Sequence, residues 1–200
     1  MTNNTTVKTR RMAGLSILTA LIIVLQVVAT FVKVGPFSFT LALAPIVIGG
    51  ALYGRKAGAW LGGVFSVVVL LMCITGGDAG GSILWNVSPL LCAVLCLVKG
   101  TAAGWVSAAV YRSIAAKNSF GAVICAAVVT PVVNTGIFLV GLVLFFQPTL
   151  AAWAGDAGMN ITSYILFGLT GVNFLVELTL NLVLSGVIER IINYRVKALA

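Results

Sequence analysis

Long apolar stretches separated by short basic clusters are the feature that most constrains how this chain can fold. Of its 200 residues, 60% are hydrophobic and 8% are charged, whereas an ordinary soluble domain has about 25% charged residues. A membrane-crossing helix takes roughly 20 residues, so the chain has room for about six of them and none for a soluble catalytic domain. The composition predicts an all-α membrane protein and excludes a disordered or collagen-like chain.

The positions of the basic residues predict the orientation of the helices. Ten of the twelve lysines and arginines fall in four clusters that flank apolar stretches, whereas Asp78 and Asp156 lie between the clusters. Basic residues concentrate on the cytoplasmic side, so we expect a six-helix bundle with both termini in the cytoplasm. Short clusters do not make a continuous basic surface, and no nucleic-acid partner is expected. The clusters lie at residues 8–11, 55–56, 112–117 and 190–197.

The whole chain, residues 1–200, is predicted to form one transmembrane domain. Its glycines at positions 50, 54, 58 and 62 recur every four residues, a spacing that lets membrane helices approach closely. We therefore expect close packing around the turn between the second and third spans. The predicted spans are 12–34, 41–53, 57–75, 85–111, 120–146 and 163–190, with cytoplasmic tails at 1–11 and 191–200.

The residue inventory excludes several classes of enzyme. The chain has no histidine, which excludes a Ser-His-Asp hydrolase and a histidine-liganded metal site. Cys73, Cys92, Cys96 and Cys125 fall inside predicted spans, so we interpret them as packing residues and not as metal ligands or a disulfide framework. The segment 49–56 resembles an ATP-binding loop but has arginine where that motif needs lysine. We expect no enzymatic activity, no catalytic residue, and no metal or cofactor in this chain.

Polar groups deep in the spans are the residues expected to carry function, because their burial in a bilayer is costly. Lys99 and Glu177 each lie 13 residues before a cytoplasmic arginine, which places both about 20 Å above that side. Asn134 reaches a similar depth on the fifth span. Lys99 and Glu177 could form a buried ion pair that only fixes helix register, or they could belong to a small-molecule site.

Helical periodicity extends this set to two polar stripes that plausibly face each other. At 100° per residue, each stripe covers an arc of about 80°. One contains Trp85, Ser88, Cys92, Cys96 and Lys99, and the other contains Thr170, Asn173, Glu177 and Asn181. Segments 76–84 and 148–159, with Trp153, are expected to cover the site. The predicted substrate-binding residues are Lys99, Asn134, Glu177, Asn173, Asn181, Trp85, Asn86 and Ser88.

Three segments carry a resemblance to a known family. They are the glycine-rich corner 45–59, the run Leu97-Val98-Lys99-Gly100-Thr101-Ala102-Ala103-Gly104, and the following Val110-Tyr111-Arg112. With its six predicted spans, the chain resembles the substrate-binding S components of energy-coupling factor (ECF) vitamin transporters. Members of that family dock on a coupling subunit through an Ala-x-x-x-Ala pattern in the first helix. The corresponding residues here are Ala13, Ser16 and Ala20.

The resemblance implies a function in vitamin uptake across a prokaryotic cell membrane. Such a subunit binds its vitamin from outside and releases it inward together with a transmembrane coupling subunit and two ATPase subunits, which hydrolyse the ATP. The segment 130–138 is most similar to members assigned to pantothenate, with Lys99 pairing with the vitamin's carboxylate. Other vitamins such as riboflavin remain open, as do a structural subunit of a membrane complex and, more weakly, a membrane enzyme using Glu177 or Asp78.

Overall fold

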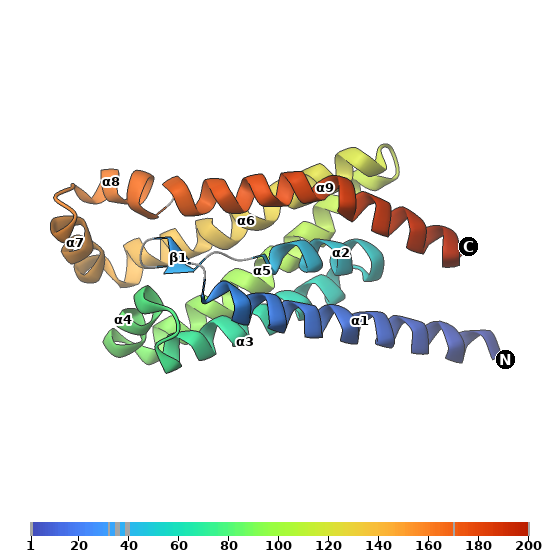
Figure 1. Cartoon of the computed structure of the whole chain (residues 1–200), viewed down its shortest axis with the longest axis horizontal. Helices are drawn as coiled ribbons and strands as arrows, with labels where there is room; N and C mark the ends of the chain where they lie inside the picture. Colours follow the sequence, from blue (N-terminus) through green and yellow to red (C-terminus); the bar gives the residue numbers. More distant parts are fainter. Residues whose placement is uncertain (1, 32, 35–36, 39–40, 170, 200) are drawn as a thin grey trace.

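The chain forms an elongated helical bundle (Figure 1). The computed structural model describes residues 2–31, 33–34, 37–38, 41–169 and 171–199, and leaves out the side chains of 2–7, 33–34, 37–38, 171–173 and 195–199. The helices are α1 (Thr2–Ala29), α2 (Leu43–Tyr53), α3 (Arg55–Thr75), α4 (Ala79–Val87), α5 (Pro89–Ala115), α6 (Ser119–Phe145), α7 (Gln147–Asp156), α8 (Ile161–Ser163), the π-helix η1 (Tyr164–Leu169) and α9 (Gly171–Leu199). The strands β1 (Lys33–Val34) and β2 (Phe37–Ser38) pair antiparallel.

The expectation of an all-helical membrane protein is confirmed. Within the described residues, five helical stretches are long and apolar enough to cross a bilayer. The predicted span 41–53 corresponds to α2, whose 11 residues extend only about 16 Å, well short of a hydrocarbon core of roughly 30 Å. Residues Leu43 to Gly50 of α2 are all buried inside the bundle. The five stretches are Lys8–Ala29, Arg55–Thr75, Pro89–Ala115, Ser119–Phe145 and Ile161–Tyr194.

The predicted span 85–111 is wrong at its beginning. The structure divides this region into α4 and α5, with Ser88 in an extended conformation between them. Pro89 is the first residue of α5, where its missing N–H breaks no hydrogen bond inside that helix. Asp78 caps α4 by accepting a hydrogen bond from the Gly81 N–H at 2.7 Å. The continuous apolar character of the sequence hides this change of direction.

Other helix ends also differ from the predicted spans. α1 begins ten residues earlier than predicted, at Thr2, and ends at Ala29, after which the short hairpin of β1 and β2 follows. The last span is preceded by a π-helix and continues past residue 190 to Leu199. A one-residue widening of the helical repeat, as in a π-helix, has no hydropathy signal. Helices α3 and α6 lie within two residues of their predicted bounds.

Close packing through glycines is confirmed where α3 crosses α5. A Cβ atom added at Gly58 would collide with the backbone carbonyl of Gly104, and one added at Gly62 would collide with that of Gly100. The two backbones therefore touch without intervening side chains, as small-residue helix interfaces in membranes allow. Gly54 has a left-handed φ of 91° and forms the corner between α2 and α3. These contacts fix the depth at which α5 presents its polar residues.

We expect Gly62→Ala to destabilise the protein by about 1–3 kcal/mol, because the methyl group forces α3 away from α5. Gly186→Ala is the matched control, since nothing lies within 4 Å of a Cβ at that position of α9. Thermal unfolding of the purified protein in detergent measures both. A Gly62→Ala variant as stable as the control would contradict backbone contact at this crossing.

Both chain termini lie at one end of the bundle, and α4 and α7 lie at the other (Figure 1). We expect the α4 end to face outward, because the basic clusters lie near the end with the termini. Single cysteines introduced at the exposed positions Ala79 and Asp156 should react with a membrane-impermeant maleimide in intact cells. A cysteine at Lys117 should react only after lysis, and the unmodified chain gives the background. The reverse labelling pattern would overturn this orientation.

Candidate functional site

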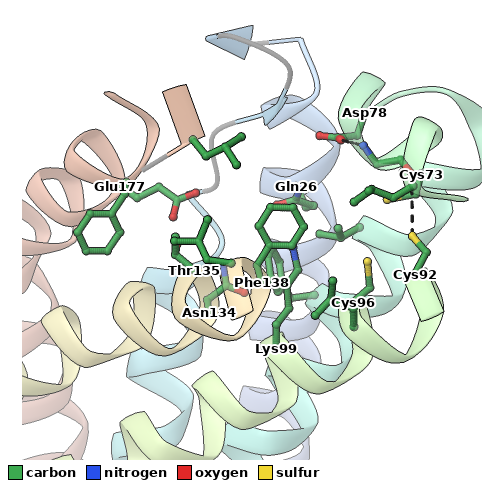
Figure 2. Close-up of a pocket in the computed structure, with 18 residues that line it drawn as sticks. Gln26, Cys73, Asp78, Cys92, Cys96, Lys99, Asn134, Thr135, Phe138 and Glu177 are labelled. Atoms are coloured by element: carbon green, nitrogen blue, oxygen red, sulfur yellow. Dashed lines mark hydrogen bonds between the residues drawn. The ribbon is translucent and has the colours of Figure 1, made fainter. Parts of the chain in front are cut away.

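A cavity of about 90 Å³ lies inside the bundle. Figure 2 shows its polar residues converging from several helices. Three of the eight predicted substrate-binding residues belong to its wall: Lys99 from α5, Asn134 from α6 and Glu177 from α9. The remaining wall residues are Gln26, Phe65, Val69, Cys73, Asp78, Gly81, Leu84, Cys92, Leu95, Cys96, Thr135, Phe138, Leu139, Leu169 and Phe174.

Lys99 contacts an aromatic ring in the centre of this cavity. Its ammonium lies 4.6 Å from the centroid of the Phe138 ring, within the distance of a cation–π interaction. Glu177 lies to one side of this pair in Figure 2 and approaches the cavity from another helix. Among the described contacts, the partner of the ammonium is the Phe138 ring.

Asn134 presents an unsatisfied hydrogen-bond acceptor at the cavity. Its side chain is only 6% exposed, and within the described part of the chain its Oδ1 has no hydrogen-bond partner. A buried polar atom without a partner costs about 1–3 kcal/mol. Thr135 follows it on the wall, and Pro131 lies one turn earlier inside α6. A ligand that donates a hydrogen bond to Asn134 would remove this cost.

Helix α9 turns a polar face toward the bundle. Glu177, Asn181 and Ser185, which are four residues apart, are all buried. Asn181 donates a hydrogen bond from Nδ2 to the Glu177 backbone carbonyl at 2.9 Å and does not belong to the cavity wall. Asn173 belongs to α9, but its side chain lies outside the described residues, as does the whole of Thr170. Of this predicted stripe, the structure brings Glu177 to the cavity.

Trp85, Asn86 and Ser88 are not part of the cavity wall. Trp85 packs against an apolar cluster, Asn86 is exposed, and Ser88 precedes the first turn of α5. The predicted stripe assumed one continuous helix, whereas the break at Ser88 separates Trp85 from the cysteines and Lys99 of α5. Trp153 packs against the same apolar cluster as Trp85. None of residues 148–159 lines the cavity, whereas α4 does contribute to it.

Gln26 and Asp78 line the cavity but were absent from the predicted site. Gln26 is a buried amide near the C-terminal end of α1, and the cost of burying polar groups, which identified Asn134, applies equally to it. Asp78 was assigned to an outer loop, and its role as the cap of α4 brings it to the wall. Each of these residues comes from an element that the predicted stripes did not include.

Three cysteines form a buried cluster at one side of the same cavity. The sulfur atoms of Cys73, Cys92 and Cys96 all lie within 4.8 Å of one another. Cys92 and Cys96 are one turn apart on α5, and Cys73 faces them from the last turn of α3. The Cys92 thiol donates a weak hydrogen bond to the backbone carbonyl of Gly81 (Figure 2). The sequence shows the pair on α5 but cannot show that Cys73 joins it.

Comparison with known families establishes what kind of protein has this cavity. A model of the family described as "ECF transporter, substrate-specific component" matches residues 10–192. The chain belongs to this family. A search of curated proteins found no match to this ECF component. As a substrate-specific component, it is a substrate-binding membrane subunit of an ECF transporter, and its family is one of transporters and not of enzymes.

Family membership also defines the role of this chain within a larger complex. An ECF component works in a membrane complex with coupling and ATPase subunits and takes a small-molecule substrate. The part of the work that falls to this chain is recognition, for which an internal cavity with a few convergent polar groups is the usual arrangement.

Proposed function

We propose that this ECF component binds a vitamin with a carboxylate, best matched by pantothenate, from the outer side of a prokaryotic cell membrane. A transmembrane coupling subunit and two ATPase subunits, which hydrolyse the ATP, then drive its release inward. Lys99 pairs with the vitamin's carboxylate. Asn134 and Glu177 receive its hydroxyl or amide hydrogens. The observation that carries this proposal is the meeting, in one cavity, of the half-buried Lys99 ammonium and the buried Asn134 Oδ1, which has no partner among the described residues.

The lining of the cavity favours a flexible polar ligand over a large aromatic one. The aromatic side chains of the wall are Phe65, Phe138 and Phe174, and none of the four tryptophans lines it. A flavin ring is best held by broad stacking surfaces, whereas hydroxyl, amide and carboxylate groups need the separate donors and acceptors present here. Pantothenate therefore fits better than riboflavin.

The size of the cavity implies that ligand binding widens it. Its 90 Å³ is below the roughly 300–1,000 Å³ typical of small-molecule sites. The Lys99 ammonium, held over the Phe138 ring, is the group best placed to move, because a carboxylate is a stronger partner for a cation than an aromatic face. Rotation of Lys99 toward the ligand would open space above the ring.

Docking on the coupling subunit is proposed to use the small residues of α1. Ala13, Ser16 and Ala20 are all exposed on this helix, and α1 has the lowest buried share among the five candidate spans. Small exposed side chains allow another membrane helix to approach closely. The exposure of these three small side chains fits such a role.

Titration of the purified protein tests the ligand. We expect calorimetry to show binding of one pantothenate per chain, with a dissociation constant in the micromolar range or below, and no binding of riboflavin at the same concentrations. The physical reason is the match between the vitamin's carboxylate and Lys99. Riboflavin binding without pantothenate binding would refute the pantothenate proposal while leaving family membership intact.

A further inference from the structure

The thiols of Cys73, Cys92 and Cys96 make a group whose geometry the vitamin site does not use. We propose that these three cysteines form a binding site for a soft divalent metal ion of the zinc class. The site lies at the opposite side of the Lys99–Phe138 pair from Glu177 (Figure 2). It therefore does not depend on which vitamin the cavity accepts.

The positions of the sulfur atoms fit three ligands of one ion. Zinc binds thiolates at about 2.3 Å, so two sulfurs on the same ion are separated by about 3.8 Å. The three sulfurs here lie within 4.8 Å of one another, so adjustments of less than about an ångström, within the range of a rotamer shift, bring them to that spacing. Soft thiolate ligands select ions such as zinc over magnesium or calcium. Three protein ligands would leave the fourth position open toward the cavity.

A residue without a side chain, Gly81, packs against the sulfur cluster. Gly81 of α4 faces the sulfurs, and a Cβ at this position would collide with the Cys73 sulfur. The Cys92 thiol donates a weak hydrogen bond to the Gly81 carbonyl, at 3.9 Å. A glycine at this place keeps side-chain atoms away from the sulfur cluster. All three cysteines also belong to the cavity wall, so an ion reaches them by the route that the ligand takes.

Charge balance favours a divalent ion over a monovalent one. Binding displaces three thiol protons to solvent and leaves one divalent ion with three thiolates, a group of net charge −1. Lys99 lies three residues beyond Cys96 on α5 and lines the same cavity. While no vitamin is bound, the positive charge of Lys99 neutralises the group, which matters because an uncompensated charge within a membrane is costly. A monovalent ion with three thiolates would leave an excess negative charge.

Titration of the reduced, metal-free protein with Zn²⁺ tests the proposal. We expect one ion per chain, and affinity at least a hundredfold lower in Cys73→Ser, Cys92→Ser and Cys96→Ser. Cys125→Ser is the matched control, because Cys125 lies outside the cluster, and its affinity should equal that of the unmodified chain. Affinity should also rise with pH, since the thiols must lose their protons. Equal affinity in the cluster variants and the control would overturn the proposal.

A second measurement on the unmodified protein covers the case in which the serine variants fail to fold. X-ray absorption at the zinc edge should show three sulfur neighbours at about 2.3 Å. A shell of only oxygen or nitrogen neighbours would refute the site. Absence of zinc binding at micromolar concentrations would refute it equally.

Discussion

Replacing Lys99 by methionine is expected to lower the affinity for pantothenate by about 1.5–3 kcal/mol, roughly ten- to more than a hundredfold. Methionine keeps much of the apolar stem but cannot form the charge-assisted hydrogen bond to the carboxylate. Stability should change less than affinity, because the described contact of the ammonium is the Phe138 ring. Calorimetry and thermal unfolding of the same preparation measure the two effects.

Two further variants separate ligand binding from internal charge balance. Lys117→Met is the matched control, since Lys117 is exposed between α5 and α6, and its affinity should be unchanged. If Lys99 served only to neutralise Glu177, the double variant Lys99→Met with Glu177→Gln would recover binding. We expect this double variant to fold and still bind poorly. If the double variant bound pantothenate as tightly as the parent chain, Lys99 would not be the partner of the carboxylate.

Placing tryptophan at Ala20 is expected to abolish vitamin uptake while leaving vitamin binding intact. Ala20 is exposed on α1, so a large ring can extend away from the bundle and prevent close approach of a partner helix. Uptake of radiolabelled vitamin by cells that also produce the partner subunits measures transport. Calorimetry on the isolated chain measures binding.

Leu21→Trp is the control for a bulky ring on α1. Leu21 is 41% exposed and lies about 100° around the helix from Ala20, away from the small-residue face. Its transport should remain close to that of the parent chain. Equal uptake in the Ala20 and Leu21 variants would exclude the small-residue face of α1 from coupling. Loss of binding in the Ala20 variant would show instead that the substitution disturbs the fold.

Sequence reasoning located the long helices well because hydropathy is a local property. The third and fifth predicted spans lie close to α3 and α6. It failed at Ser88, where the apolar run continues although the backbone changes direction. The information was present in Pro89, which is tolerated in the first turn of a helix and disfavoured in its interior. The short length of α2 was predicted within two residues by the span 41–53, whereas the π-helix before α9 has no signal in hydropathy.

The residues of the candidate site that could be predicted are those whose burial in a membrane costs the most free energy. Lys99, Asn134 and Glu177 stand out in apolar surroundings, and the structure brings all three to one cavity. The cysteine cluster was not predictable, because cysteine is common among buried apolar residues. Only the packing of α3 on α5 brings Cys73 close to Cys92 and Cys96. Asp78 was hidden because helix caps resemble loop residues in sequence.

The glycine-lined crossing of α3 and α5 has a mechanical consequence. At Gly58 and Gly62 the backbones of α3 and α5 are in direct contact. Neither helix can slide or rotate without breaking several contacts at once, so the two helices should move as one rigid unit. Lys99 and the three clustered cysteines all belong to these two helices. The substrate's path must then open through motion of the parts around them. The nine-residue α4, which lines the cavity and joins this pair through Gly76 and Ser88, is a part of the wall that can move without disturbing the crossing.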